Sequence, residues 1–350
     1  MKTLLRLLLK SQHQQNRSGP PQTEKGMTLV ELLVGAIMAF LILTPMLGFV
    51  VDMLNTDRRE QVKSNTEQDI QAAVDFIAQD LSQAIYIYDQ AGITATTAKL
   101  PPPPTNTTGT PILVFWKRQQ IKNAVPINSA VTAKKPSDCK SNPGQCNDTY
   151  VLSLVAYYQI RDTTPNLTWC QPLGGTCPTR IARYEIRDGV KNPNSSDPTN
   201  PYYSLTDPNE YAPDAAFEPT FDISKPLVNV TKGGGFKDDA QVLVNYIDHS
   251  QLTGIPINPA ECQTALGNPM DTTGATPTAI PETTLRIPPA PPDIVNSFYA
   301  CVDTSKNIAR VTLRGNSLRR LQTDANYDAN KSAYFPTATV QVQGLGALGK

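Results

Sequence analysis

The sequence contains few histidines, no net charge and few aromatic residues. Only His13 and His249 occur in 350 residues, so neither a histidine-based catalytic triad nor a zinc site with several histidines is expected. The 31 Lys and Arg residues equal the 31 Asp and Glu residues in number. This balance argues against a general nucleic-acid-binding protein, which needs a surplus of positive charge.

Sequence motifs for cofactor binding are incomplete. Residues 344–349 read Gly-Leu-Gly-Ala-Leu-Gly, but the chain reaches Lys350 where a dinucleotide-binding motif would open a helix. We expect a flexible tail there. The glycines 233–235 lack the Lys-Ser/Thr pair of a phosphate-binding loop. We therefore expect no cofactor and no enzymatic activity; an anchored hydrolase that uses His249 is a third option for function, without an identifiable nucleophile.

Charge is unevenly distributed along the chain. Residues 1–26 carry five positive side chains and one negative side chain, whereas residues 27–350 carry 26 positive and 30 negative ones. A basic leader in front of an acidic remainder is typical of a chain whose amino terminus stays in the cytoplasm while the rest is exported.

Residues 32–51 form an apolar run of 20 residues without a charge. A helix of this length spans roughly 30 Å, the thickness of the bilayer core, and the run is too long for a cleaved secretory signal. We expect a single membrane span at about residues 32–51, with a cytoplasmic amino terminus and the residues after about 52 outside.

Glu31 lies at the edge of this apolar run. An ionised carboxylate in hydrocarbon costs roughly 2.5–3.5 kcal/mol, so the residue needs an explanation. One explanation is that Glu31 lies at the level of the lipid headgroups, as an acid at the end of a simple signal anchor does. It also belongs to a longer pattern, because residues 24–31 read Glu-Lys-Gly-Met-Thr-Leu-Val-Glu after a basic leader.

This junction resembles the class III signal of type IV pilins and pseudopilins. The resemblance implies that a prepilin peptidase cleaves between Gly26 and Met27 and methylates the new amine of Met27. It also implies that Glu31 of one subunit pairs with the Met27 amine of a neighbour in a filament, so that two groups costly in a membrane neutralise each other. A leader of 26 residues is long for this family.

Pro45 lies inside the apolar run. Its ring removes a backbone donor and leaves the carbonyl of Leu41 without its usual partner. In an ordinary anchor this is a tolerated kink. The resemblance to pilins implies instead a region that can unwind during filament assembly.

A helical repeat continues beyond the apolar run and predicts one helix from about Thr28 to Tyr88, within a segment 27–90. Apolar residues recur at spacings of three and four, as on one face of a helix that packs against a core: Ile70, Ala73, Val74, Ile77, Leu81, Ala84, Ile85 and Tyr88. Polar residues occupy the other faces: Asp69, Asp75, Gln79, Asp80 and Gln83. Residues 91–111, which include four consecutive prolines at 101–104, predict a linker.

Residues 112–350 predict a β-rich head. Seven segments have strand patterns: 112–116, 150–160, 181–187, 242–247, 297–302, 308–313 and 337–342. Segment 150–160 is the most apolar and is expected to be central, while residues 183–187 alternate as in a strand with one wet face. No helical repeats separate these strands, so we expect an antiparallel α+β fold. The long Pro-rich connections 188–240 and 249–296 are expected to be binding elements or disordered.

All six cysteines follow the apolar run: Cys139, Cys146, Cys170, Cys177, Cys262 and Cys301. An even number on the exported side predicts disulfides. Of the 15 pairings that six cysteines allow, we favour consecutive pairs. Zinc is the rival, but its cysteine ligands are usually separated by two to four residues. The resemblance also raises calcium binding by loop acids such as Asp207, Glu210 and Asp214, without an EF-hand spacing to support it.

Two further segments narrow the resemblance. Residues 71–81 resemble the J group of minor pseudopilins in type II secretion, and residues 311–316 with the Pro-rich insertions resemble cyanobacterial pseudopilins of hormogonium polysaccharide secretion. The resemblance implies a minor pseudopilin of the inner membrane, with its head outside, that assembles through its amino-terminal helix into a pseudopilus or its tip. This subunit supports secretion of polysaccharide or protein.

The implied partners are the prepilin peptidase, other pilins or pseudopilins, and an inner-membrane assembly platform with its ATPase. No nucleic-acid partner is expected. The alternative function is a single-pass exported adhesin or binding protein that does not polymerise.

Overall fold

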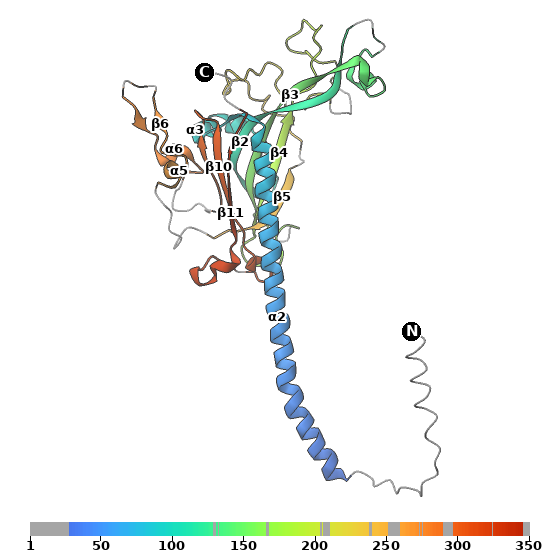
Figure 1. Ribbon diagram of the computed structural model, residues 1–350, viewed down its shortest axis with the longest axis vertical. Helices are drawn as coiled ribbons and strands as arrows, with labels where there is room; N and C mark the ends of the chain where they lie inside the picture. Colours follow the sequence, from blue (N-terminus) through green and yellow to red (C-terminus); the bar gives the residue numbers. More distant parts are fainter. Residues whose placement is uncertain are drawn as a thin grey trace, which may run out of the picture. The chain divides into compact units, whose positions relative to one another are not determined.

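The computed structural model describes residues 28–345 apart from residues 129, 130, 132, 166, 167, 204, 206–210, 238, 239, 251–259, 273, 275, 290–296 and 324. The chain divides into two compact units, Met1–Asp57 and Arg58–Lys350. The helix α2 (Leu29–Ser82) contributes to both units. The second unit contains a five-stranded and a four-stranded sheet, both antiparallel (Figure 1).

The helix α2 has 54 residues and ends at Ser82. The sequence predicted a helix to about Tyr88, and this end is wrong because Ala84–Ile87 form strand β1. β1 pairs antiparallel with β2, with Ile87 opposite Phe115. The apolar residues of this stretch fit the period of a helix and that of a strand, and the pairing with β2 decides between them.

The five-stranded sheet has the order β1-β2-β3-β4-β5. Its longer strands are β2 (Thr107–Pro126), β3 (Cys146–Asp162), β4 (Thr179–Arg187) and β5 (Gln241–Ile247). All four were predicted, and the most apolar segment is the central strand β3, as expected. Residues 183–187 were predicted to have one wet face. Arg183 on that face is buried and ion-paired, whereas Glu185 and Arg187 are half-buried.

The four-stranded sheet has the order β11-β10-β9-β8. Its strands are β11 (Thr337–Gln343), β10 (Ile308–Arg314), β9 (Phe298–Asp303) and β8 (Arg286–Ile287). The first three were predicted, so the expected antiparallel α+β class is confirmed. Smaller elements precede this sheet in the chain: α5 (Glu261–Ala265), the β6–β7 hairpin (Met270–Asp271 and Thr278–Ala279) and α6 (Glu282–Leu285).

Both sheets and the second half of α2 share one apolar core. The buried face of α2 includes five residues that the helical repeat predicted: Ile70, Ala73, Val74, Ile77 and Leu81. Gly315 follows β10 directly, and a Cβ atom there would lie 2.8 Å from Cγ2 of Thr66 and 3.0 Å from Cγ1 of Ile70. The absence of a side chain at this position lets α2 pass closely over the end of β10.

The expected linker 91–111 is largely part of the globular unit. It contains most of helix α3 (Gln90–Thr96) and the start of β2, and Asp89 caps α3 by accepting a hydrogen bond from the Gly92 amide at 2.7 Å. The prolines 101–104 are irregular, but the hydroxyl of Tyr158 donates to the Pro101 carbonyl at 2.8 Å. The proline run therefore lies against the sheet.

The connection 188–240 also contributes to the core. The ring centre of Phe221 lies 3.9 Å from that of Trp116, in a stacked arrangement, and Phe217 contacts the same indole edge-on. Trp116 is fully buried. For Phe217 and Phe221 the expectation of disorder is wrong, because their aromatic side chains cover the sheet. Binding by this connection stays a prediction.

The three disulfides join the consecutive cysteines that the sequence favoured. They are Cys139–Cys146, Cys170–Cys177 and Cys262–Cys301, with Cα–Cα distances of 5.9, 4.8 and 5.2 Å. No cysteine is left as a thiolate ligand, which rules out the rival zinc site built on cysteine.

Candidate functional site

The amino-terminal end of α2 carries Glu31, which the sequence linked to assembly. Gly26 and Met27 lie outside the described residues. The helix begins after Thr28, whose hydroxyl accepts a hydrogen bond from the Glu31 amide at 3.3 Å. Thr28-x-x-Glu31 is the sequence pattern of a capping box, and a carboxylate in the first turn is favourable beside the positive end of the helix dipole. Glu31 thus also stabilises the start of the helix.

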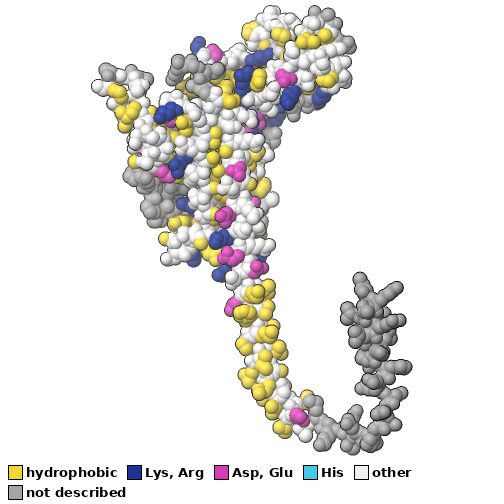
Figure 2. Space-filling model, in the orientation of Figure 1, with side chains coloured by type: hydrophobic (Ala, Val, Ile, Leu, Met, Phe, Trp, Pro, Cys, Tyr) yellow, Lys and Arg dark blue, Asp and Glu magenta, His cyan; other side chains and the backbone are white. Residues whose placement is uncertain are grey.

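The following part of α2 exposes its apolar side chains on all sides. Every large hydrophobic side chain from Leu29 to Leu54 is exposed, from 43% at Val50 to 82% at Leu29, and Figure 2 shows apolar side chains along most of this stretch on the face in view. A helix apolar all round requires lipid or other apolar helices as its surroundings. This stretch is long and apolar enough to cross a membrane, and a signal sequence near an amino terminus has the same properties.

The helix continues through Pro45 without interruption. The hydroxyl of Thr44 donates to the carbonyl of Phe40 at 2.8 Å, a local contact that often accompanies a bend in a helix. The resemblance to pilins implied a region that can unwind here. In the structure this region is helical.

The second half of α2 is fixed to the five-stranded sheet by a buried cluster of charges. Oδ2 of Asp80 lies 2.6 Å from Nε of Arg183, and Oδ1 lies 3.1 Å from Nζ of Lys117. The hydroxyl of Tyr157 also donates to Asp80 at 2.7 Å. Glu185 completes the cluster, at 3.2 Å from Lys117 and 2.8 Å from Arg183. Strands β2, β3 and β4 therefore all bind one helical side chain.

This cluster balances two cations with two carboxylates. Burial alone would raise the pKa of Asp80, but the hydrogen bond and charge of Arg183, together with the charge of Lys117, outweigh it and hold the pKa below its usual value. The same competition lowers the pKa of Glu185. Both carboxylates are thus ionised near neutral pH, and the buried charges compensate one another.

The sequence placed Asp80 on a polar face of the helix, and that expectation is wrong because only 7% of the residue is exposed. A signal existed: Asp80 follows Ile77 by three residues, which puts it beside the apolar stripe. Lys117 and Arg183 are likewise charges within apolar strands. Together these three residues pointed to a buried ion cluster, but a single sequence does not say which charges meet.

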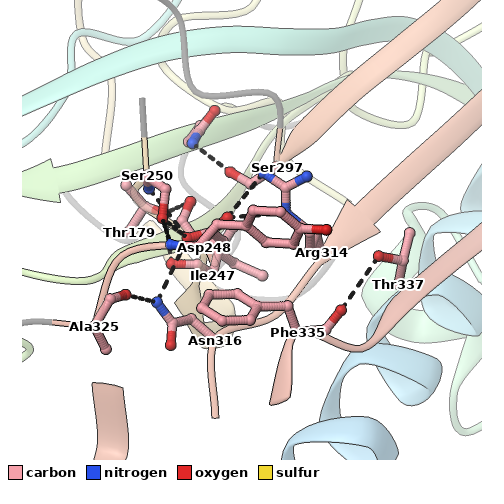
Figure 3. A network of polar contacts seen from close by, with 12 residues as sticks. Thr179, Ile247, Asp248, Ser250, Ser297, Arg314, Asn316, Ala325, Phe335 and Thr337 are labelled. Atoms are coloured by element: carbon pink, nitrogen blue, oxygen red, sulfur yellow. Dashed lines mark hydrogen bonds and ion pairs between the residues drawn. The ribbon is translucent and has the colours of Figure 1, made fainter. Parts of the chain in front are cut away.

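A second polar network joins the ends of the two sheets (Figure 3). Asp248, directly after β5, accepts from Nε of Arg314 at 2.9 Å and from the Ser250 hydroxyl at 2.6 Å. The Ser250 oxygen accepts from the amide of Tyr327 at 2.6 Å. These contacts give Asp248 and Ser250, on either side of His249, structural roles at the ends of the two sheets.

The structure gives no support, in the described part of the chain, to the calcium binding that the resemblance raised as an alternative. Asp207 and Glu210 lie outside that part. Asp214 accepts a hydrogen bond from the Arg187 amide at 2.7 Å and pairs with Lys237. No cluster of three or more potential metal ligands occurs among the described residues.

The start of the expected flexible tail is fixed in place. The amide of Gly344 donates to the carbonyl of Asn307 at 2.9 Å, and the amide of Leu345 donates to the carbonyl of Ala84 at 2.8 Å. A Cβ at position 344 would lie 2.2 Å from the oxygen of Ala84. The first glycine of the run is therefore needed for close packing; residues 346–350 lie outside the described residues.

These features describe one helix with an acidic start, an apolar exposed part and a charged anchor in a globular α+β unit. Comparison with protein-family models, with curated proteins and with solved structures finds no match for this chain.

Proposed function

We propose that the chain is a minor pilin-like subunit, a pseudopilin, that assembles through α2 into a filament or its tip and supports secretion. One observation carries the proposal: the sequence Gly26-Met27-x-x-x-Glu31 leads into a helix, α2, that has an exposed apolar stretch and a second half buried in a globular unit. The apolar stretch needs lipid or other apolar helices around it. The membrane supplies the lipid, and a bundle of such helices in a filament supplies the helices.

The proposed processing step produces the group that Glu31 needs. Cleavage after Gly26 by a prepilin peptidase frees the amine of Met27, which is then methylated and carries a positive charge. When helices stagger in a filament, the amine of one subunit meets Glu31 of the next, and the cost of burying each charge falls. Pro45 supplies a position where α2 can lose helical hydrogen bonds during this packing.

A tip or priming position fits the globular unit better than a place in a repeating shaft. The unit contains two sheets and long connections, which make it bulky beside a slender helix. Subunit addition at the base would push or scaffold export of a polymer. Energy would come from the ATPase of an inner-membrane assembly platform, and neither a cofactor nor a metal enters this role.

The buried cluster around Asp80 suits such a mechanical role. A force applied along α2 reaches the sheet through the ion pairs of Asp80 with Arg183 and Lys117 and through the apolar face of the helix. Force is thereby distributed over three neighbouring strands instead of one contact.

Mass spectrometry of the mature amino terminus tests the processing step. The full chain is expressed with a prepilin peptidase, beside the variants Gly26→Val and Gly48→Val. We expect an N-methylated Met27 terminus in the unchanged chain and in Gly48→Val, because no atom lies within 4 Å of a Cβ at position 48. Gly26→Val should keep its leader.

Crosslinking in membranes tests the assembly step. Glu31→Gln removes the acid in the apolar region, and Glu60→Gln removes an exposed acid in the polar part of the same helix. We expect Glu31→Gln to be processed but to lose its crosslinks to other pilins, and Glu60→Gln to keep them. A functional chain that retains residues 1–26 and tolerates Glu31→Gln would instead be the non-polymerising exported adhesin or binding protein.

A further inference from the structure

Strands β2 and β3 continue beyond the five-stranded sheet as a two-stranded ribbon. β1 pairs with β2 as far as Lys117, and β4 pairs with β3 only from Ser153 onward. The stretch 118–152 makes backbone hydrogen bonds to Gln83 and Asp188 at its base, through Arg118 and Leu152. Beyond them its described strand residues pair with each other; we call this stretch the ribbon. In Figure 1 it extends past the other strands of the second unit.

The ribbon is positively charged in an otherwise acidic exported chain. It contains five cations, Arg118, Lys122, Lys134, Lys135 and Lys140, against two acids. The rest of residues 27–350 holds 21 cations and 28 acids. All five cationic side chains are exposed, and Figure 2 shows Lys and Arg side chains gathered over this part of the molecule.

The two acids of the ribbon accept hydrogen bonds from backbone amides of the ribbon itself. Asp138 accepts from the amide of Lys134 at 3.0 Å, and Asp148 accepts from the amide of Asn123 at 2.9 Å. These hydrogen bonds fix the turns of the ribbon. The net positive charge consequently sits on a surface of defined shape.

One face of the ribbon combines cations with an exposed aromatic ring. Arg118, Gln120 and Lys122 alternate along β2 and so share a face, and Gln120 lies opposite Tyr150 on β3. The guanidinium carbon of Arg118 lies 3.7 Å from the centre of the Tyr150 ring, and Tyr150 is 52% exposed. The result is a flat aromatic surface with positive charge at its border.

The opposite face of the ribbon is already occupied. Ile121, Ala124 and Val151 are buried in a small cluster with Val190 and Tyr211. The face with Tyr150 is therefore the one presented to a partner.

The remaining exposed residues of the ribbon include four amides: Gln120, Asn123, Asn128 and Asn147. An amide both donates and accepts hydrogen bonds and so suits hydroxyl groups. Large exposed apolar side chains are few, with Ile127 and Tyr150 as the examples in the described ribbon. A protein interface would be depleted in Lys and richer in apolar residues at its centre, and a membrane surface would need apolar anchors beside the cations.

We propose that the ribbon binds an acidic polysaccharide. Cations pair with carboxylate or sulfate groups of the polymer, amides with its hydroxyl groups, and the Tyr150 ring with the apolar C–H face of a sugar. The polymer is the cargo that the proposed function leaves open, and to that extent the inference rests on that function. Binding by the ribbon itself requires neither processing nor assembly.

The Cys139–Cys146 disulfide prepares the tip of the ribbon for binding. It joins α4 (Pro136–Cys139) to the first residue of β3. Lys134, Lys135 and Lys140 lie beside this link, so their backbone is held before a ligand arrives. Less conformational entropy is then lost on binding.

Binding of the purified full chain in detergent to immobilised polygalacturonate tests the proposal. The triple variant Arg118→Gln/Lys122→Gln/Lys135→Gln removes three exposed charges from the ribbon. The matched control Lys225→Gln/Lys232→Gln/Lys331→Gln removes three exposed lysines elsewhere. We expect the ribbon variant to lose affinity at least about tenfold and the control less than about twofold. Unchanged melting temperatures check that both variants fold.

Binding measurements with other polymers distinguish recognition of the sugar from recognition of negative charge alone. We expect neutral dextran to bind weakly, and Tyr150→Leu to reduce binding of polygalacturonate but not of polyglutamate. Equal binding of polyglutamate and polygalacturonate would overturn the assignment to a polysaccharide, as would binding of phosphatidylglycerol vesicles alone. If polygalacturonate does not bind while Met27 is still processed and α2 still crosslinks, this inference fails and the proposed function stands.

Discussion

Nε of Arg183, in the fourth strand of the five-stranded sheet, lies 2.6 Å from Oδ2 of Asp80, in the last turns of α2. Residues 103 positions apart in the chain thus form a buried ion pair. Lys117 and Glu185 extend the pair into a compensated cluster. The anchorage of the helix therefore depends on charge as well as on apolar contacts, and it can be tested separately from them.

Replacing Asp80 by Asn should strongly destabilise the globular unit. The change leaves Arg183 and Lys117 buried with only Glu185 as a counter-charge, and breaking a buried pair in this way costs about 3–5 kcal/mol. Urea unfolding of the full chain in detergent, followed by the fluorescence of buried Trp116, measures the loss.

Asp75→Asn is the matched control, because Asp75 lies on the same helix and is exposed. Its effect should stay below about 0.5 kcal/mol. Equal unfolding curves for the two variants would mean that the charged cluster does not hold α2 to the sheet.

The same cluster predicts a loss of stability in acid. The pKa of Asp80 and that of Glu185 are lower in the folded protein than their usual values of 3.8 and 4.5. The stabilisation is therefore fully present above the usual values and is lost as the pH falls through the lowered ones. Unfolding free energy should fall below about pH 4, and Asp80→Asn should show a shallower fall. A parallel pH dependence in both proteins would contradict this assignment.

Asp188 should behave in the opposite way. Burial raises its pKa above 3.8 despite the charge of Lys191 and the hydrogen bond from Tyr202. A raised carboxyl pKa makes ionisation oppose folding, so stability is lost as the pH rises through the folded value. Asp188→Asn keeps an acceptor for the Tyr202 hydroxyl. We expect the variant to gain stability relative to the unchanged chain between pH 3 and pH 7, measured by urea unfolding at each pH; a relative loss would show that the contact with Lys191 dominates.

A methyl group at position 315 should separate α2 from the end of β10. A Cβ there would meet the side chains of Thr66 and Ile70 at 3.0 Å or less, and such overpacking costs about 1–3 kcal/mol. Gly315→Ala should lower the unfolding free energy by this amount. Adding Thr66→Ser removes the clashing methyl group of Thr66 and should restore part of the loss. Gly234→Ala, in open space, should have little effect.

The sequence predicted most strands of the fold because their patterns are local. All seven predicted segments are strands, and the apolar stripe from Ile70 to Leu81 is the buried face of α2. The end of the helix was missed because the apolar residues of Ala84–Ile87 fit the period of a helix and that of a strand. Only the pairing with β2 makes this segment a strand. The role of Phe217 and Phe221 was missed for a similar reason: their partner Trp116 lies 100 residues away, in a strand that the loop returns to cover.

The candidate site was less accessible to sequence reasoning. The junction at Gly26, Met27 and Glu31 is a short contiguous pattern in the sequence, and its role in processing and assembly stays a prediction. The cluster of Asp80, Arg183 and Lys117 is formed by three distant segments. A charge on a strand predicts a solvated face until the covering helix is known, which is why β4 was expected to be wet.

The three disulfides should contribute unequally to stability. Closing a loop stabilises the folded state mainly by restricting the unfolded chain, by about 2.5 kcal/mol for a separation of 7 residues and about 4 kcal/mol for one of 39 residues. Replacing Cys262 and Cys301 together by Ala should therefore cost more than replacing Cys139 and Cys146. The buried position of the longer link, in a cluster with Leu266 and Leu285, adds to the difference because its removal leaves a cavity. Urea unfolding of the two double variants under oxidising conditions measures both losses, and titration of the denatured, unreduced chain should find no reactive thiol. Equal losses would show that the unfolded chain keeps residues 262 and 301 close even without their covalent link.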